Sequence, residues 1–341
     1  MEHPPSSAPA AFFFWRHLNL LRWLVLSLVF AMLILLPYVS LYQNYVAGHA
    51  YDLLTPHERQ IYDAMEWITA PIAKSDPAKN LNAIKGNTWS GTLFGLALSD
   101  PLAVVGQIAA QMKIYWPFLL TALIPIGLTV LFGRFYCGWI CPATFLYEIN
   151  DTVRNALRRL GLLSSGKRWD LRLKYLVLAV GVGLSTVLGT VVFSAIYPPV
   201  IVGREIQYWI TDNGMGVGLT FFLITLLFDL LVTRRGFCRY LCPGGALYSL
   251  LGRYRLFRIQ RQVARCNDCT LCDKVCQFAL QPMRDGFGQE CNNCTACIAV
   301  CPTQALTFHV QLADQPYQGH GHLGAAYKRL QLHSAVKEEL R

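Results

Sequence analysis

The cysteines of this chain fall into four short motifs that account for all twelve of them. Two motifs have the spacing C-x2-C-x2-C-x3-C, and two have the spacing C-x3-C followed directly by proline. The longer motifs, here called the first and second ferredoxin runs, consist of Cys266, Cys269, Cys272 and Cys276, and of Cys291, Cys294, Cys297 and Cys301. The two short motifs consist of Cys137 and Cys141 before Pro142, and of Cys238 and Cys242 before Pro243. Thiolates so closely spaced are typical of metal or cluster ligands.

The spacing of the longer motifs predicts two cubane iron–sulfur clusters. In such runs three closely spaced thiolates bind one cluster, and the fourth binds the other cluster. On this rule the first cluster is bound by Cys266, Cys269, Cys272 and Cys301, and the second by Cys291, Cys294, Cys297 and Cys276. A structural zinc ion would gain nothing from the third cysteine of each run, and a disulfide framework would imply an oxidising compartment.

The rest of the chain is apolar enough to lie in a membrane. Of its 341 residues, 54% are hydrophobic and only 15% are charged. Four apolar stretches are long enough to be read as spans, and they cover about residues 18–42, 114–132, 175–197 and 217–232. The first stretch is too long for the core of a signal peptide and is not followed by an A-x-A cleavage signal, so we expect an uncleaved anchor.

The positive charges predict how these spans are oriented. Lys and Arg are concentrated between the second and third spans and after the fourth, whereas the loop between the third and fourth carries only Arg204. Cytoplasmic loops are enriched in Lys and Arg, so we expect a multi-pass protein of the bacterial inner membrane with residues 1–17 and the polar tail 311–341 in the cytoplasm. The segment 43–113 is then outside, and all twelve cysteines are on the reducing side. This distribution accounts for the net charge of +10 without nucleic acid, for which the chain has no binding motif.

The short motifs belong to an internal repeat with an offset of 101 residues. The offset superimposes an arginine and both cysteines: Arg134 on Arg235, Cys137 on Cys238 and Cys141 on Cys242. Each motif follows an even-numbered span at its inner end, so we expect two helical hairpins related by an axis along the membrane normal. The proline after each motif favours a helix end at its second cysteine. The four thiols suit a metal, a further cluster or a redox-active dithiol, and the alternative is that they are small hydrophobic residues.

The outer segment 43–113 is expected to have two parts. The first is polar, with a helix around Glu58 to Trp67 and a loop rich in Pro, Lys and Asp from Pro71 to Asn82. The second, from Trp89 to Gln111, is expected to be an interfacial or re-entrant piece whose helix opens at Asp100-Pro101.

These patterns together predict an α-helical membrane protein whose four transmembrane helices form two repeated hairpins, followed by a C-terminal α+β two-cluster ferredoxin-like domain. The membrane domain is expected over residues 18–256 and the ferredoxin domain over residues 257–310. A short strand over residues 303–309 is expected to close the ferredoxin domain.

Two carboxylates are candidate proton acceptors for a membrane quinol. Asp229 lies inside the fourth span, where a carboxylate is costly unless it has a function; its alternative role is a hydrogen bond to a neighbouring span. Glu148 follows the first short motif, and its alternative role is a solvated residue at the membrane surface. The predicted spans contain no histidine pair for a b-type haem, and the chain has no C-x-x-C-H motif and no dinucleotide glycine fingerprint.

These motifs, in this order, resemble the membrane-bound polyferredoxins of the quinol-dehydrogenase (NapH/MauN-like) 4Fe-4S family. The resemblance covers roughly residues 89–310 and is carried by segments 133–142 and 237–243 and the two ferredoxin runs. It implies four spans and two [4Fe-4S] clusters that take electrons from quinol and pass them to a protein redox partner, either a ferredoxin or a reductase subunit. Gln277 after Cys276 departs from the proline usual in such runs, and the outer insert 43–88 matches no particular branch of the family.

Two other functions are compatible with the sequence. A related group of membrane ferredoxins with C-x3-C-P motifs is implicated in copper reduction for oxidase maturation, and soft thiolates suit Cu(I). The chain also fits a membrane anchor that docks a separate ferredoxin, with its own clusters only structural.

Overall fold

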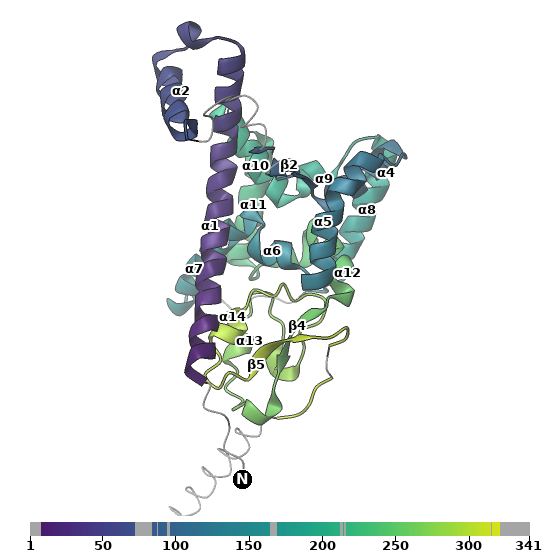
Figure 1. The fold of residues 1–341 in the computed structure, drawn as a ribbon. Coiled ribbons are helices and arrows are strands. Elements are labelled where there is room, and N and C mark those ends of the chain that lie inside the picture. The colour runs from purple at the N-terminus through teal and green to yellow at the C-terminus, as the bar shows by residue number, and fades with distance from the viewer. Residues whose placement is uncertain are drawn as a thin grey trace, which may run out of the picture. The chain divides into compact units, whose positions relative to one another are not determined.

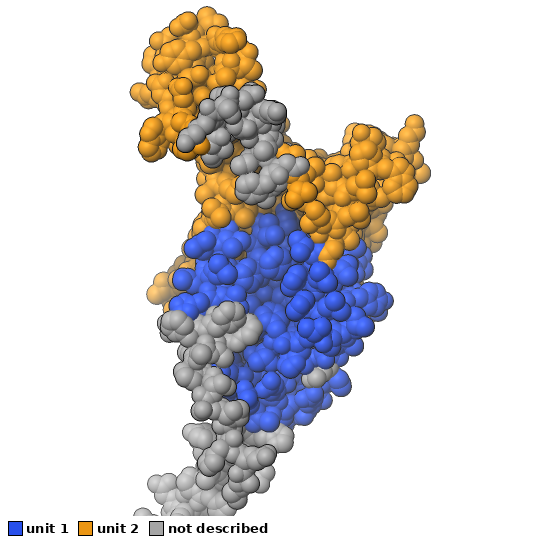
Figure 2. Space-filling view, viewed as in Figure 1, with its two compact units in different colours: residues 1–25, 128–140, 248–341 blue, residues 26–127, 141–247 orange. Residues whose placement is uncertain are grey.

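The computed structural model describes residues 8–71, 84–86, 88–93, 96–163, 169–211, 214, 216–314 and 316–320. Residues 1–7, 72–83 and 321–341, which include parts of the N-terminal segment, outer loop and tail expected above, lie outside the described residues. The chain divides into two compact units, coloured separately in Figure 2. Unit 1 contains residues 1–25, 128–140 and 248–341, and unit 2 contains residues 26–127 and 141–247.

Apolar helices dominate the part of the chain expected in the membrane (Figure 1). Helix α1 (Ala8–Ala47) contains His17–Ala47, which is the one helical stretch among the described residues long and apolar enough to cross a membrane. Three shorter apolar helices are α5 (Trp116–Phe132), α8 (Leu173–Leu188) and α11 (Val217–Leu231). Helices α5 and α11 agree with the expected second and fourth spans.

The expected third span is wrong in its C-terminal part. Helix α8 ends before Gly189, whose φ of 64° is the left-handed conformation that closes many helices. The chain then forms the separate short helix α9 (Phe193–Ile196) and, beginning at Pro198, helix α10 (Pro198–Ile210). Helix α10 occupies what the sequence analysis treated as a loop.

The segment between α1 and α5 contains a capped helix and a small sheet. Helix α2 (Pro56–Thr69) begins with a capping box in which Thr55 and Glu58 each accept from the other's backbone N–H. Strands β1 (Ile84–Gly86), β2 (Ser90–Leu93) and β3 (Leu96–Ser99) form an antiparallel sheet in the order β1-β2-β3, which the sequence analysis did not expect. Such short strands carry too little alternation to be recognised.

The internal repeat is visible in the order of elements. In the first copy, α4 (Pro101–Gln111) and α5 precede α6 (Phe135–Trp139) and α7 (Pro142–Arg159). In the second copy, α10 and α11 precede the π-helical turn η2 (Phe237–Leu241) and α12 (Pro243–Leu251). Each copy thus has a short helix that begins with proline, an apolar helix, a turn carrying the first cysteine and a helix that begins at the proline after the second.

Small residues let the helices of unit 2 approach one another. Helix α4 packs against α8, and both α7 and α10 pack against α11. At Gly181 of α8, an added Cβ would lie 2.4 Å from Cε1 of Phe193, so this contact requires glycine. At the start of α4, Asp100 accepts a hydrogen bond from Leu102 N at 2.8 Å, which confirms the helix start expected there.

Unit 1 contains an α+β arrangement around the ferredoxin runs. Strands β4 (Phe257–Arg261) and β5 (Leu306–Val310) pair antiparallel, with Ile259 opposite Phe308. Between them lie the short helices α13 (Leu271–Val275) and α14 (Ala296–Ala299) and the 3-10 turns η4 (Val263–Arg265) and η5 (Pro282–Arg284). The core combines Ile259, Phe287, Ile298 and Leu306 with five of the cysteines. The strand expected over 303–309 begins three residues later, at Leu306.

Candidate functional site

The two ferredoxin runs fold into matching backbone turns. In the first run, Asp268 and Thr270 have φ values of 56° and 60°, and in the second run Asn293 and Thr295 have values of 50° and 61°. These residues stand two and four positions after the first cysteine of each run, and each turn leads into a short helix. Left-handed residues next to residues of other backbone conformation form concave turns whose N–H groups suit negatively charged groups.

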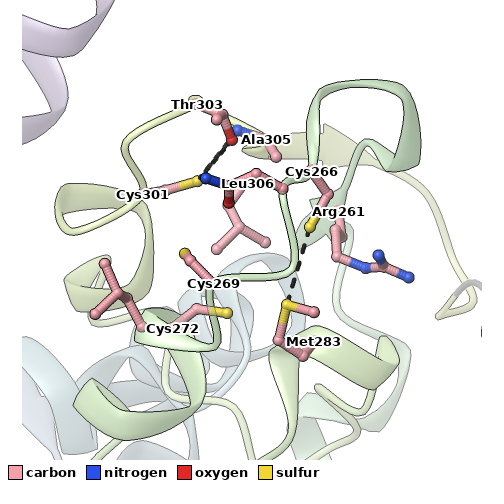
Figure 3. A pocket seen from close by; sticks show the side chains of 11 residues that line it. Arg261, Cys266, Cys269, Cys272, Met283, Cys301, Thr303, Ala305 and Leu306 are labelled. Carbon is pink, nitrogen blue, oxygen red and sulfur yellow. Dashed lines mark hydrogen bonds between the residues drawn. The ribbon is translucent and has the colours of Figure 1, made fainter. Parts of the chain in front are cut away.

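The structure brings the first predicted ligand set to one pocket (Figure 3). The sulfurs of this set belong to Cys266, Cys269, Cys272 and Cys301. Leu271, Met283 and Leu306 contribute apolar lining. The backbone N–H of Ala305 donates to Cys301 Sγ at 3.3 Å. Four thiols, an N–H donor to sulfur and an apolar wall fit the requirements of a thiolate-bound cubane.

In the second predicted set, Cys291 and Cys297 are buried and Cys276 and Cys294 are partly buried. Burial, together with charges at Cys294 and Cys291, raises the pKa of the Cys276 thiol to about 12. Burial also raises the pKa of Cys297, with contributions from the other three members of its set and from Cys272 of the first set. The four thiols are therefore within electrostatic reach of one another. A buried thiol with a raised pKa stays protonated unless a bound cation compensates its charge, and iron supplies that compensation.

Among the described residues, the cysteines form neither disulfide bonds nor a site for a single metal ion. All twelve cysteines are free, so no disulfide framework is present among them. Within the described part of the chain, no group of three or more His, Cys, Asp or Glu side chains is arranged to hold a single metal ion. The ligands of a cubane surround four irons and are therefore spread more widely than the ligands of one ion.

Each short motif changes backbone conformation at its second cysteine. Helix α6 ends at Trp139, and Cys141 is extended with φ −61° and ψ 116°. The turn η2 ends at Leu241, and Cys242 is extended with φ −65° and ψ 116°. The helix end expected before each proline is confirmed. Cys137 belongs to unit 1 and the other three thiols to unit 2, so their convergence stays a prediction.

A buried charge cluster in unit 2 contains one of the two candidate proton acceptors. Arg235, with a side chain 1% exposed, lies 3.1 Å from Glu148 and 2.9 Å from Asp151. Glu148 is itself 2% exposed, so the alternative of a solvated surface residue is wrong. The reason is that α7 packs this face against α11. The sequence aligned Arg235 with Arg134 in the repeat but did not indicate that Arg235 pairs with Glu148 and Asp151.

The second candidate, Asp229, binds the turn that follows its own helix. Its Oδ1 accepts from Phe237 N at 2.8 Å, and among the described residues its buried Oδ2 has no hydrogen-bond partner. The alternative of a side-chain hydrogen bond to a neighbouring span is therefore wrong. Arg154 of α7 contacts the carbonyl oxygens of Asp229 and Leu230 instead. Both candidate carboxylates thus contact residues 235–237, directly before Cys238.

A family model described as a 4Fe-4S binding domain matches residues 115–159 and 215–262. Each match covers an apolar helix, a short cysteine motif and the helix after it, so the two matches fall on the two copies of the repeat. The ferredoxin runs lie outside the matched ranges.

Several curated proteins are similar to about half of this chain or more. The methylamine utilization ferredoxin-type protein MauN of Methylorubrum extorquens is 33% identical over 208 residues, which are 60% of this chain and 69% of MauN. The ferredoxin-type protein NapH of Haemophilus influenzae is 32% identical over 209 residues, which are 59% of this chain and 68% of NapH. The putative electron transport protein YccM of Escherichia coli is 31% identical over 163 residues, which are 46% of this chain and 44% of YccM. No solved structure matches the chain.

Proposed function

Because the chain belongs to the family of ferredoxin-type proteins that includes MauN and NapH, we propose that it carries electrons from a membrane quinol to a protein redox partner. The family and its 4Fe-4S binding domain make the chain an iron–sulfur electron-transfer protein. The quinol donor, the partner (a ferredoxin or a respiratory reductase subunit) and the place in a bacterial inner membrane are part of the proposal.

The observation that carries the proposal is the convergence of four cysteines of the ferredoxin runs on one apolar pocket. When bound there, a [4Fe-4S] cluster supplies one-electron redox chemistry. We propose Cys266, Cys269, Cys272 and Cys301 as ligands of one cluster and Cys276, Cys291, Cys294 and Cys297 as ligands of the other. The chain contributes the thiolates, the N–H of Ala305 and apolar side chains that limit access of water.

Exposed apolar side chains support four spans. Helices α1, α5, α8 and α11 each expose large aliphatic residues, among them Leu24, Leu120, Val187 and Leu227. A soluble protein rarely leaves so much apolar surface uncovered, whereas lipid-facing helices require it. The three shorter helices, of 15–17 residues, rise about 22–26 Å, so they need the residues at their ends to cross a hydrocarbon core about 30 Å thick. We propose that both termini lie in the cytoplasm, where Lys and Arg are concentrated.

The carboxylates near Arg235 support a quinol site at the inner end of α11. Oxidation of a quinol to a quinone releases two electrons and two protons, so the site needs a proton acceptor. Asp229 offers Oδ2, a buried oxygen without a hydrogen-bond partner among the described residues, while its Oδ1 is held by Phe237 N. Glu148 pairs with Arg235 and is the second candidate.

Asp229→Asn tests the quinol site, because the amide oxygen can still accept from Phe237 N but the side chain cannot act as a base. In anaerobically purified protein we expect cluster reduction by a quinol analogue to slow by about 10²–10⁴-fold. Reduction by dithionite should be unchanged, since it needs no proton acceptor. An unaltered quinol rate in this variant would rule out Asp229.

The short motifs offer a test between iron–sulfur and copper chemistry. The 4Fe-4S binding model matches both of them, which favours an iron–sulfur role for Cys137, Cys141, Cys238 and Cys242 over copper handling. Cys238→Ser should then impair quinol-driven reduction of the ferredoxin clusters. If that reduction persists and only copper-dependent maturation of an oxidase fails, the short motifs handle copper and have no iron–sulfur role.

A further inference from the structure

Within unit 1, the end of α5 and the residues around Cys137, up to Trp139, are bound directly to the second ferredoxin run. Arg134 Nη1 lies 2.6 Å from Glu290 Oε2, and both side chains are buried. Trp139 Nε1 donates to the carbonyl oxygen of Asn293 at 3.0 Å. The side-chain amide of Asn293 donates to the carbonyl oxygen of Phe132, the last residue of α5, at 2.8 Å. We refer to these contacts as the α5 junction.

The backbones at the α5 junction also approach closely. A Cβ at Gly138 would lie only 2.7 Å from the carbonyl oxygen of Asn292, so the residue after Cys137 has to be glycine for the two segments to touch. The carbonyl of Gly138 accepts from Arg22 Nε at 3.0 Å, which fixes the motif on its other side. The junction is therefore buried and specified by several residues that are far apart in sequence.

The equivalent position in the first ferredoxin run faces a different partner. Asp268 corresponds to Asn293, since both stand two residues after the first cysteine with positive φ. Each places its Oδ1 3.5 Å from the sulfur of that cysteine. Asp268 Oδ2 lies 3.6 Å from His320 Nδ1, whereas the side-chain amide of Asn293 donates to the carbonyl oxygens of Phe132 and Phe257. The two turns thus have matching backbone conformations but contact different residues.

We propose that the α5 junction positions the second ferredoxin run. Arg134 and Trp139 then set the midpoint potential and EPR line shape of the cluster held by Cys276, Cys291, Cys294 and Cys297. They leave the potential and line shape of the cluster held by the first set unchanged. The proposal rests on the proposed function, since it needs clusters at both sets. The junction places a buried ion pair beside Cys291 and fixes the peptide that precedes Cys294. Charge, hydrogen bonding and burial around the sulfurs are what set cluster potentials. The first short motif then influences the second cluster-binding set directly and the first set not at all.

The test is potentiometric EPR on anaerobically purified full-length protein. Trp139→Phe keeps an aromatic ring but removes the N–H donor to Asn293. Its matched control is Tyr240→Phe, which removes a hydroxyl at the repeat-equivalent position in the second short motif. Cys269→Ser and Cys294→Ser assign the two signals to the first and second sets.

We expect Trp139→Phe to shift the midpoint potential and line shape of the signal that Cys294→Ser alters, and to leave the other signal unchanged. Tyr240→Phe should move neither signal. Arg134→Lys provides a second variant that keeps the charge but loses the guanidinium geometry, and it should affect the same signal. Asp268→Asn should shift only the signal of the first set, because it removes a negative charge beside Cys266.

The inference is overturned if Trp139→Phe and Arg134→Lys shift neither signal, the first signal only or both signals equally. These outcomes leave the proposed function intact, because the wild-type protein still shows two reducible clusters. A wild-type protein without clusters would remove the proposed function and this inference together.

Discussion

At the residue scale, the two copies of the repeat share a buried arginine three positions before the first cysteine of the short motif. Arg134 pairs with Glu290 in unit 1, and Arg235 pairs with Glu148 and Asp151 in unit 2. Each arginine brings a positive charge into a region from which water is excluded, and the acidic partners make that charge tolerable. The arginines occupy equivalent positions, but their partners come from different elements.

Removal of Arg235 should destabilise unit 2 strongly. Arg235→Met removes a buried arginine from Glu148 and Asp151, although Arg234 still lies 3.4 Å from Asp151. Breaking comparable buried pairs costs about 3–5 kcal/mol. We expect a lower midpoint of unfolding in detergent, measured by circular dichroism. Arg59→Met is the control, because Arg59 is an exposed residue of α2 and surface substitutions usually change stability by about 0.5 kcal/mol or less. Equal losses in the two variants would contradict the buried pairing.

The sequence predicted the cysteine sets but not the arginine pairs. Spacing alone assigned Cys301 to the set of Cys266, and the structure places both at one pocket. The offset of the repeat also aligned Arg134 with Arg235. Their partners were beyond reach because Arg134 and Glu290 are 156 residues apart, and no periodic pattern connects such positions. Glu148 was misjudged for the same reason, since its burial depends on how α7 packs.

At the element scale, the apolar helices were predictable, but the end of α8 and the presence of α10 were not. The limits of α5 and α11 follow from hydrophobicity and the charges beyond their ends, and the start of α4 follows from Asp100-Pro101. Helix α8 stops at Gly189 although the apolar sequence continues, because backbone conformation at a glycine outweighs composition. Helix α10 was missed because its proline-rich start was interpreted as a loop.

Two glycines of α8 provide an internal comparison of packing. At Gly181 an added Cβ would meet the ring of Phe193 at 2.4 Å, whereas at Gly183 it would meet nothing within 4 Å. We expect Gly181→Ala to destabilise by about 1–3 kcal/mol through overpacking. Gly183→Ala should be neutral or stabilising by up to about 1 kcal/mol, from helix propensity. Thermal unfolding of both variants in the same detergent measures the difference, and an inverted order would show that α8 does not pack on Phe193.

At the scale of the whole molecule, the sequence predicted a membrane part and an iron–sulfur part from composition and spacing. The expected domain limits, residues 18–256 and 257–310, remain predictions. The two compact units have different limits, because unit 1 combines three separate segments of the chain. One of these, residues 128–140, carries Cys137, the first cysteine of the first short motif. The sequence could not predict that this segment packs on the second ferredoxin run. The contacts of Arg134 with Glu290 and of Trp139 with Asn293 join residues far apart in the chain, and no sequence pattern connects them.

The proposed four-span arrangement predicts the side on which each end of the chain lies. A reporter active only in the cytoplasm should function when fused after residue 341 or before residue 1, and a reporter active only outside should function when inserted after Ala70. The reason is the concentration of Lys and Arg in the loops assigned to the cytoplasm. A C-terminal fusion active outside the cell would exclude this topology, and with it the placement of the cysteines on the reducing side.

The most direct test of the central claim is the iron content of anaerobically purified protein, combined with EPR of two serine variants. We predict a brown protein with at least about eight iron atoms per chain, four for each set of thiolates. Cys269→Ser should alter one EPR signal and Cys294→Ser the other, because the two residues belong to different sets. A colourless protein without iron, or serine variants that keep both signals unchanged, would contradict the account.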